Sequence, residues 1–186
     1  KYTYTASEIQ PDMLNADITQ TTDSPSWGGL YLQYFEKFDQ VQQQKGILSV
    51  TKKLFIEKIG SDGKQELLPL GKEKLKTGDK VITRLTLSLK QDMDFLYLKD
   101  FRAACFEPIG QLSGNQWKFG TVYYEESKDA VTNFFFNSLA KGTYVLEYPV
   151  WVNQAGTYQD GIATFQSMYA PEYTAYSEAG KITVTK

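Results

Sequence analysis

The sequence predicts an all-β fold, an antiparallel β-sandwich, on three observations. Tyr and Phe occur 13 and 11 times in 186 residues, and aromatic side chains favour strands. Roughly seven or eight short segments with strand character are separated by turns of Gly, Pro and Asp. No segment shows a sustained apolar period of about 3.6 residues, the signature of an amphipathic helix. A closed barrel is the alternative that the pattern leaves open.

The N-terminal part predicts extended segments and a connection. Three stretches there have strand character, residues 2–5, 16–19 and 30–35. The polar stretch from Asp39 to Gly46 looks like a linker. We therefore expect two parts, residues 1–45 and residues 46–186.

After this boundary, alternation and turn residues predict the strands of the sandwich. The expected strands are residues 47–59, 81–89, 94–99, 131–136, 143–152, 161–165 and 181–184, with another short strand that ends at Tyr123 and Tyr124. Gly60-Ser-Asp-Gly63 is a hairpin signal of the Asp-Gly kind. Phe134, Phe135 and Phe136 are consecutive, so they must place rings on both faces of their strand. We expect a neighbouring domain or loop to cover at least one of these faces.

The stretch from Gln166 to Tyr173 follows the strand expected at residues 161–165. Pro171 lacks a backbone donor and biases the residue before it toward an extended conformation, so the strand should end at about Tyr169. Met168 and Tyr169 then stand at the rim of the fold. They could cap a partner surface, because Met adapts to irregular surfaces and Tyr combines an apolar body with a polar end. The pattern alone favours the other interpretation, in which both side chains close the core.

The composition argues against three classes of function. The chain has no histidine, the commonest general base and metal ligand, which weighs against an enzyme. We expect no catalytic residue, no metal ligand and no cofactor. A net charge of −2 with interspersed signs offers no basic stripe for nucleic acid, and no apolar run is long enough to span a bilayer. The start at Lys1 suggests a piece of a larger polypeptide.

Cys105 is the one cysteine of the chain. Its context, Cys105-Phe-Glu-Pro108, is close to Cys-x-Glu-Gln, the sequence that forms an internal thioester. Pro108 has no side-chain amide to condense onto a thiol, so Cys105 cannot form that bond. We expect a small buried apolar residue instead.

Four acidic residues flank one expected strand: Asp92, Asp94, Asp100 and Glu107. Paired carboxylates can hydrolyse glycosides, but alternation places these four on solvent faces, and no feature of the sequence would raise their pKa. We expect Asp100 and Arg102 instead to pair with loop charges and to fix the crossover that follows the strand.

Several motifs, in order along almost the whole chain, carry a family resemblance. They are Trp27-Gly-Gly-Leu-Tyr-Leu-Gln-Tyr-Phe-Glu, Gly78-Asp-Lys, Leu98-Lys-Asp-Phe-Arg-Ala, Phe106-Glu-Pro, Ser113-Gly, Tyr123-Tyr124, Phe134-Phe-Phe, Leu139-Ala-Lys-Gly-Thr-Tyr-Val-Leu-Glu-Tyr148 and Gln166-Ser-Met-Tyr-Ala-Pro-Glu. Together they resemble the C-terminal end of bacterial α2-macroglobulin-family proteins. The resemblance implies a terminal macroglobulin-like, immunoglobulin-like β-sandwich from residue 46 onward. It also implies that residues 1–45 are returning strands of a preceding split β-domain and a connecting segment.

The resemblance also implies a function and a setting. The family comprises large bacterial envelope proteins, often periplasmic lipoproteins, that trap attacking proteases. In members with a thioester, a Met-Tyr pair of the terminal domain shields that bond from water, and the matching residues here are Met168 and Tyr169. The implied partners are the helical thioester domain of the same polypeptide and, through the full-length protein, target proteases. In a member without a thioester the same loop would only dock domains.

We therefore expect a non-catalytic interaction module of a protease-trapping inhibitor. The alternative is a carbohydrate- or peptide-binding β-sandwich of a surface protein, which would use exposed aromatic rings. Coplanar rings on a concave surface would favour the alternative, and a convex tip that carries Met168 and Tyr169 would favour docking.

Overall fold

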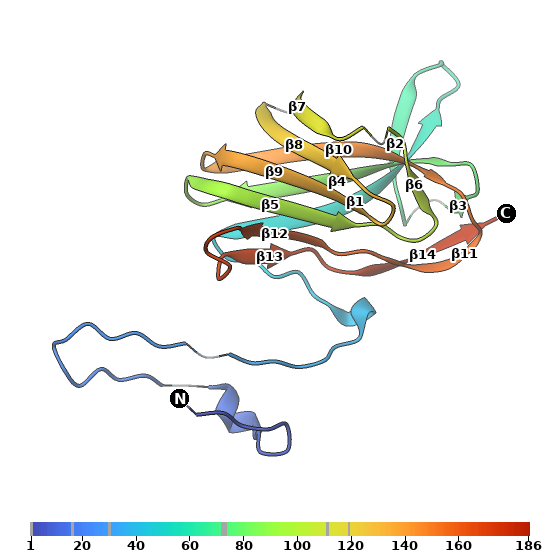
Figure 1. The fold of residues 1–186 in the computed structure, drawn as a ribbon. Coiled ribbons are helices and arrows are strands. Elements are labelled where there is room, and N and C mark those ends of the chain that lie inside the picture. The colour runs from blue at the N-terminus through green and yellow to red at the C-terminus, as the bar shows by residue number, and fades with distance from the viewer. Residues whose placement is uncertain (1, 16, 30, 72–73, 111, 119) are drawn as a thin grey trace. The chain divides into compact units, whose positions relative to one another are not determined.

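The computed structural model describes residues 2–15, 17–29, 31–71, 74–110, 112–118 and 120–186. The chain divides into two compact units, Lys1–Phe35 and Glu36–Lys186. The second unit contains three β-sheets, and the chain that links them runs back and forth between layers (Figure 1). The prediction of an all-β, mostly antiparallel sandwich is confirmed.

The five-stranded sheet has the order β2-β1-β4-β10-β6. Its strands are β1 Leu48–Ile59, β2 Gln65–Pro69, β4 Lys80–Leu89, β6 Phe106–Pro108 and β10 Gly142–Val152. All four pairs are antiparallel, and β4 is the central strand, paired along its length with β1 and β10. The hairpin predicted at residues 60–63 joins β1 to β2, with Gly63 at a φ of 77° that the turn requires.

The six-stranded sheet has the order β13-β12-β5-β9-β8-β7. Its strands are β5 Met93–Phe101, β7 Gly114–Lys118, β8 Thr121–Ser127, β9 Val131–Leu139, β12 Ala163–Ser167 and β13 Thr174–Tyr176. The third sheet has three strands in the order β11-β14-β3. These strands are β3 Leu75–Lys76, β11 Gly156–Asp160 and β14 Gly180–Thr185, and β11 and β14 directly flank β12 and β13 along the chain. The β14–β3 pair is parallel.

The core lies between the sheets because each long strand alternates inward and outward side chains. On β10, Leu146, Tyr148 and Val150 are buried, whereas Trp151 is exposed. The same alternation on β4, β5 and β12 brings their apolar side chains into one cluster, which Phe134, Phe136 and Leu139 of β9 join.

The strands predicted in the N-terminal part are not found. In the described residues before Leu48 the regular elements are two 3-10 turns, η1 Pro11–Leu14 and η2 Phe38–Gln40. Ala16 and Leu30, which belong to two of the predicted strands, lie outside the described residues. A strand is stable only when another strand pairs with its backbone groups, and the described part of residues 1–35 forms no such ladder.

The stretch predicted to be a linker packs on the sandwich. The backbone N–H of Gln44 donates to the Tyr176 carbonyl (3.0 Å), and the N–H of Ala179 donates to the Val41 carbonyl (3.2 Å). The Gln43 side chain donates to the Val50 carbonyl (2.6 Å). These bonds explain why residues 36–45 belong to the second compact unit.

Gly161 lies at the corner where the chain passes from β11 to β12. A Cβ atom at this position would stand 2.1 Å from the carbonyl oxygen of Phe101, at the end of β5. Glycine is required there because the backbone of β5 approaches too closely for any side chain.

Gly161→Ala should therefore destabilise the sandwich by about 3 kcal/mol or more, since backbone atoms must move to admit the methyl group. Urea unfolding monitored by tryptophan fluorescence measures the change. Gly46→Ala is the matched control, because its Cβ would meet nothing within 4 Å. Equal stabilities of the two variants would contradict the close approach.

Candidate functional site

The turn between β12 and β13 is held by its own hydrogen bonds. The N–H of Ser167 donates to the Tyr173 carbonyl (3.1 Å), and the N–H of Tyr173 donates to the Ala170 carbonyl (2.9 Å). The Ser167 hydroxyl accepts a bond from the N–H of Ala170 (3.2 Å). The strand ends at Ser167, slightly before the predicted end at Tyr169, and the closed turn gives the residues after it a defined position.

Met168 and Tyr169 project from this turn into solvent, with 50% and 79% of their surface exposed. The interpretation that both close the core, which the pattern alone favoured, is therefore wrong. The reason is that the inward phase of β12 ends at buried Ser167, and the turn carries the next two side chains away from the sheets.

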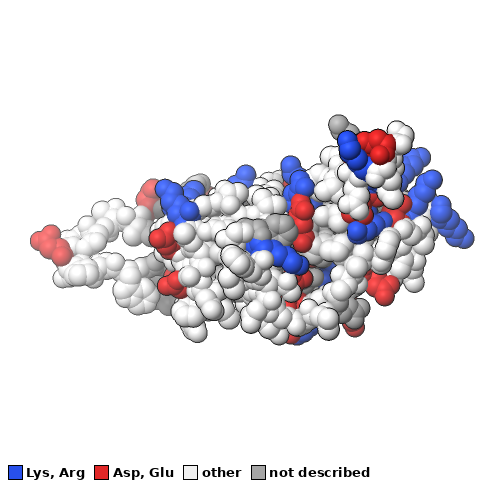
Figure 2. Space-filling model, turned by 90° about the horizontal axis from the view of Figure 1, so that it is seen from above, with Lys and Arg blue, Asp and Glu red and all other residues white. Residues whose placement is uncertain are grey.

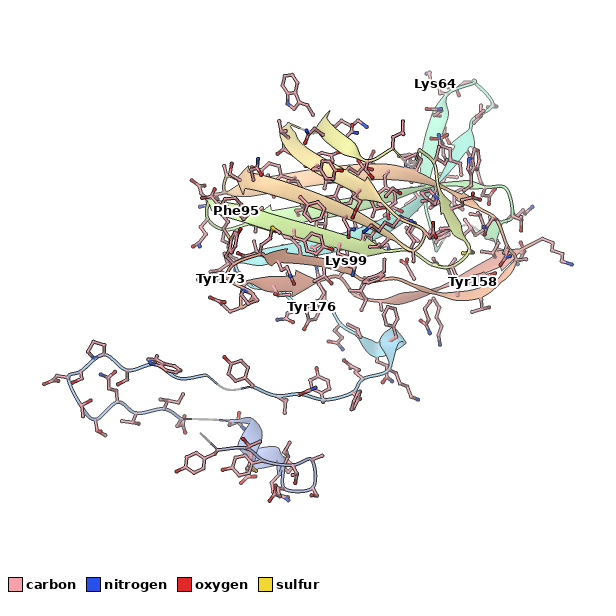
Figure 3. All side chains as sticks on the ribbon, viewed as in Figure 1. Lys64, Phe95, Lys99, Tyr158, Tyr173 and Tyr176 are labelled. Carbon is pink, nitrogen blue, oxygen red and sulfur yellow. The ribbon has the colours of Figure 1, made fainter. Side chains whose placement is uncertain are left out.

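Phe95 completes an apolar tip with these two residues, and sequence reasoning missed it. Its ring meets Tyr169 edge-on, with centroids 5.2 Å apart, and its carbonyl accepts a bond from the N–H of Met168 (2.9 Å). Figure 3 shows Phe95 and Tyr173 at the same end of the six-stranded sheet. We call Phe95, Met168 and Tyr169 the apolar tip.

The backbone of Phe95 is unusual. Its φ is 52°, in the left-handed region that a bulky aromatic residue rarely adopts, and its ring is 48% exposed. Such strain persists only where the surrounding structure imposes it, and it often marks functional positions. The sequence carried no signal for this conformation, because Phe95 lies within a stretch that reads as an ordinary strand.

The outer face of the six-stranded sheet carries a row of aromatic rings across three strands. Tyr97 on β5 stacks on Phe135 on β9, with centroids 5.0 Å apart and an interplanar angle of 25°. Tyr124 on β8 lies against the other side of Phe135, at 6.2 Å. Phe134 and Phe136 point into the core. The prediction that the three consecutive phenylalanines occupy both faces is confirmed.

A cluster of charges lies buried between the sheets, centred on Lys52 of β1. Its Nζ lies 2.9 Å from Asp100 Oδ1 and 2.9 Å from Asp160 Oδ1, and the Lys52 and Asp100 side chains are 3% and 0% exposed. Nζ also donates to the carbonyls of Phe101 (2.7 Å) and Gly161 (2.9 Å). One ammonium group thereby joins β1 to the ends of β5 and β11.

The prediction that Asp100 faces solvent is wrong. Leu96, Leu98 and Asp100 share the inward phase of β5, and all three are fully buried. The other predicted solvent-facing acids, Asp92, Asp94 and Glu107, are exposed as expected.

Arg102 fixes the crossover after β5, as predicted, but through different partners. The guanidinium donates to the hydroxyl of Thr132 and to the carbonyls of Lys128 and Asp129, the last at 2.9 Å. Backbone carbonyls and a hydroxyl therefore hold this buried cation in place of the predicted loop charges.

Burial and charge shift the pKa values in the Lys52 cluster. Desolvation lowers the pKa of Lys52, but the neighbouring Asp100 and Asp160 outweigh it, so the net shift is upward. Burial is the main cause that raises the pKa of Asp160, opposed by the charge of Lys52. Tyr148 donates its hydroxyl hydrogen to Asp100 Oδ2 (2.5 Å), and burial together with the Asp100 charge raises the Tyr148 pKa well above its ordinary value.

The sequence did contain a signal for Lys52. Leu48, Val50, Leu54 and Ile56 are the buried residues of β1, and Lys52 occupies the middle of their alternation. A lysine in the inward phase of an otherwise apolar strand indicates a buried pair, because an unpaired charge there would be too costly.

Further observations on the described residues concern metal ligands, the thiol and membrane-spanning helices. Among the described residues, no group of three or more His, Cys, Asp or Glu side chains could hold a metal ion. Cys105 is fully buried, as predicted, and burial raises the pKa of its thiol to about 11. In the same described part of the chain, no helix is long and apolar enough to cross a membrane. Positive and negative residues are interspersed on the face drawn in Figure 2.

One hollow of about 180 Å³ lies beside β6, β7, β8 and β10. Its walls include Gln116, Lys118, Glu125 and Glu147, with Tyr148 as the aromatic contributor. These walls are mostly polar and lack a set of exposed coplanar rings. The aromatic row on the six-stranded sheet uses its rings to stack on one another.

Comparison with known proteins gives a family match and a fold match. Residues 48–172 match the family described as the bacterial alpha-2-macroglobulin MG10 domain. No curated protein matches.

Solved structures with the same fold include those of two alpha-2-macroglobulins, from Salmonella and from Escherichia coli. Salmonella alpha-2-macroglobulin reacted with methylamine is 20% identical, with a TM-score of 0.60 over 78% of this chain and 10% of that one. Escherichia coli alpha-2-macroglobulin activated by porcine elastase is 18% identical, with a TM-score of 0.60 over 78% of this chain and 14% of that one. The native Escherichia coli protein is 18% identical, with a TM-score of 0.59 over 84% and 10% of the two chains. This chain thus spans only a small part of each.

Lys52→Met should destabilise the chain by about 3 to 5 kcal/mol, because the buried Asp100 and the partly buried Asp160 lose their cation. Chemical denaturation of the variant and the parent chain measures the difference. Lys80→Met is the control, since its pair with Glu57 is as short (2.8 Å) but partly exposed, and it should cost less than about 1 kcal/mol. A cost for Lys52→Met no greater than that of the control would refute the role of the cluster.

Cys105 should resist alkylation in the folded chain, because its thiol is buried and stays protonated up to a pH of about 11. Iodoacetamide at pH 8 should label the native chain at least about 100-fold more slowly than the chain in 6 M guanidinium, as followed by mass spectrometry. Rapid labelling of the native chain would show that the sandwich opens around Cys105.

Proposed function

The chain belongs to the bacterial alpha-2-macroglobulin MG10 domain family, and on this premise we propose that it is the terminal, non-catalytic domain of a protease-trapping inhibitor. It works through contacts with neighbouring domains of the same polypeptide, among them a helical thioester domain. Target proteases are engaged by the full-length protein.

The observation that carries this proposal is the exposed apolar tip. Met168 and Tyr169 expose apolar surface to water at a hydrogen-bonded turn, and Phe95 enlarges this surface. Burial of such a patch against a partner is favourable. Such a tip suits docking against another domain. In a parent protein with a thioester, Met168 and Tyr169 shield that bond, because a thioester survives only where water is excluded. In a parent without one, the same contact holds the domains together.

Residues 1–45 belong, on this proposal, to a preceding β-domain and its connection. The supporting observation is the exposure of large apolar residues in the first compact unit: Trp27 is 98% exposed, Tyr31 94% and Phe35 102%. Side chains of this size are normally buried, so a larger parent would cover them by adding these segments to another sheet. Residues 36–45 then tie that domain to the sandwich through the bonds of Val41 and Gln44.

The setting proposed for the parent protein is the bacterial cell envelope, where it is periplasmic or extracellular and anchored by lipid. The name of the matching family supports a bacterial inhibitor. The Escherichia coli relatives solved after activation by elastase or trypsin support proteases as the targets. The alternative, a carbohydrate- or peptide-binding module, has no comparable support, since the described hollow beside Tyr148 lacks a platform of rings.

The double variant Met168→Ala, Tyr169→Ala tests docking in the full-length parent. If the parent carries a thioester, its reaction with methylamine should be about 10- to 100-fold faster, since burial of such side chains contributes about 1.5 to 3 kcal/mol each. Stopped-flow detection of the released thiol measures the rate. Sedimentation velocity reports whether the compact form opens, which applies to a parent without a thioester as well.

Ile59→Ala is the matched control, because Ile59 is 77% exposed at the end of β1 in the other large sheet. Both variants should unfold at the same denaturant concentration as the unsubstituted protein, because the substitutions alter exposed residues. An unchanged methylamine rate together with an unchanged compact form would end the docking proposal.

A further inference from the structure

The Lys52 cluster brings an amine and two carboxyl groups into contact between the sheets, where the Lys52 and Asp100 side chains are buried and that of Asp160 is 17% exposed. Lys52 Nζ lies 2.9 Å from an oxygen of each carboxylate. Both of these oxygens are buried and depend on this one ammonium group. Nζ also donates to the backbone carbonyls of Phe101 and Gly161. Four acceptors thus compete for one nitrogen, and two buried carboxylate oxygens with so small a share of donors call for an explanation.

We propose that Lys52 and Asp100 condense to an intramolecular isopeptide bond that joins β1 to β5 and so links the two large sheets covalently. The proposal concerns a modification of the domain itself and does not depend on its docking function. The arrangement in the structure is that of the reactants.

The reaction balances within the cluster. A proton passes from the Lys52 ammonium to the Asp100 carboxylate, leaving a neutral amine and a neutral acid. The nitrogen lone pair forms a bond to Cγ of Asp100, the bond from Cγ to one carboxyl oxygen breaks, and that oxygen leaves with two hydrogens as water. The ammonium and the carboxylate together thus become one amide and one water, and no oxidant, reductant or cofactor is consumed.

Asp160 and Tyr148 occupy the positions that this reaction needs. Asp160 Oδ1 contacts the same nitrogen, so it can take the proton that the nitrogen must lose and pass it to the departing oxygen. Its pKa is raised by burial, which suits a group that must hold a proton in passing. Tyr148 donates a hydrogen bond to Asp100 Oδ2, where negative charge develops when the nitrogen adds to Cγ.

Two physical effects favour the amide over the ion pair at this site. The rigid strands hold the nitrogen against the carboxyl group, so the reaction bears little entropic cost of encounter. Burial penalises the charged Lys52 and Asp100 and not the neutral amide. Asp160 loses its cation in the reaction, but its side chain is 17% exposed and can be hydrated. The N–H that remains on the amide stays within reach of the carbonyls that now bind the ammonium.

Intact-mass spectrometry of the denatured 186-residue chain tests the proposal directly. The expected mass is lower than that of the sequence by one water. Trypsin should then yield residues 46–53 joined through Lys52 to residues 100–102, because cleavage after an acylated lysine is blocked. A mass equal to that of the sequence, without the loss of one water, would overturn the proposal, as would separate tryptic peptides that end at Lys52 and begin at Asp100. The cluster would then be ionic only.

Variants separate the proposed roles. Lys52→Arg keeps the charge but cannot form the amide, so its mass should equal that of its sequence. Asp160→Asn should leave the reactants unjoined, or join them at least 10-fold more slowly after refolding, if Asp160 relays the proton. If Asp160→Asn forms the amide completely and as fast as the unsubstituted chain, shown by the same mass decrease of one water, that role is refuted. The Lys80–Glu57 pair, 2.8 Å apart but partly exposed, is the internal control and should remain unlinked in the same digest.

Discussion

The buried ammonium of Lys52 is the interaction on which the arrangement of the sheets depends. A charge in a dry interior is tolerated only when opposite charges and carbonyl dipoles surround it. Here those groups come from β5, from the end of β11 and from the corner at Gly161. The three sheets must therefore meet at one point, and the meeting point is set by electrostatics rather than by apolar packing, which is less directional.

The corner at Gly161 follows from the same requirement. The carbonyls of Phe101 and Gly161 can both reach Lys52 only if the two backbones nearly touch, and a Cβ at Gly161 would overlap the Phe101 carbonyl. Glycine at this position is thus a consequence of the charge that must be satisfied. It also allows the chain to leave the three-stranded sheet and to enter the six-stranded one as β12.

The cluster and the apolar tip lie at opposite ends of one pair of strands. β5 and β12 pair antiparallel from Ala163 opposite Asp100 to Ser167 opposite Leu96. Their cluster end is held by the charges, and their other end carries Phe95, Met168 and Tyr169. The β5–β12 ladder fixes the position of the apolar tip relative to the cluster, because the backbone groups of the two strands are hydrogen-bonded along the ladder. A tip with a fixed position is what a docking contact between domains requires.

The sequence by itself determined the sandwich, the 60–63 hairpin, burial of Cys105 and the two-faced phenylalanine run, because these follow from local alternation and turn chemistry. The sequence also indicates a buried pair at Lys52, because this lysine interrupts the alternating apolar residues of β1. Only the tertiary structure decided that Asp100 faces inward, that Phe95 takes a left-handed backbone and that Met168 and Tyr169 are exposed. Each of these depends on where a strand ends and which distant strand lies opposite. Local pattern cannot encode that, since a shift of one residue reverses the face of every side chain.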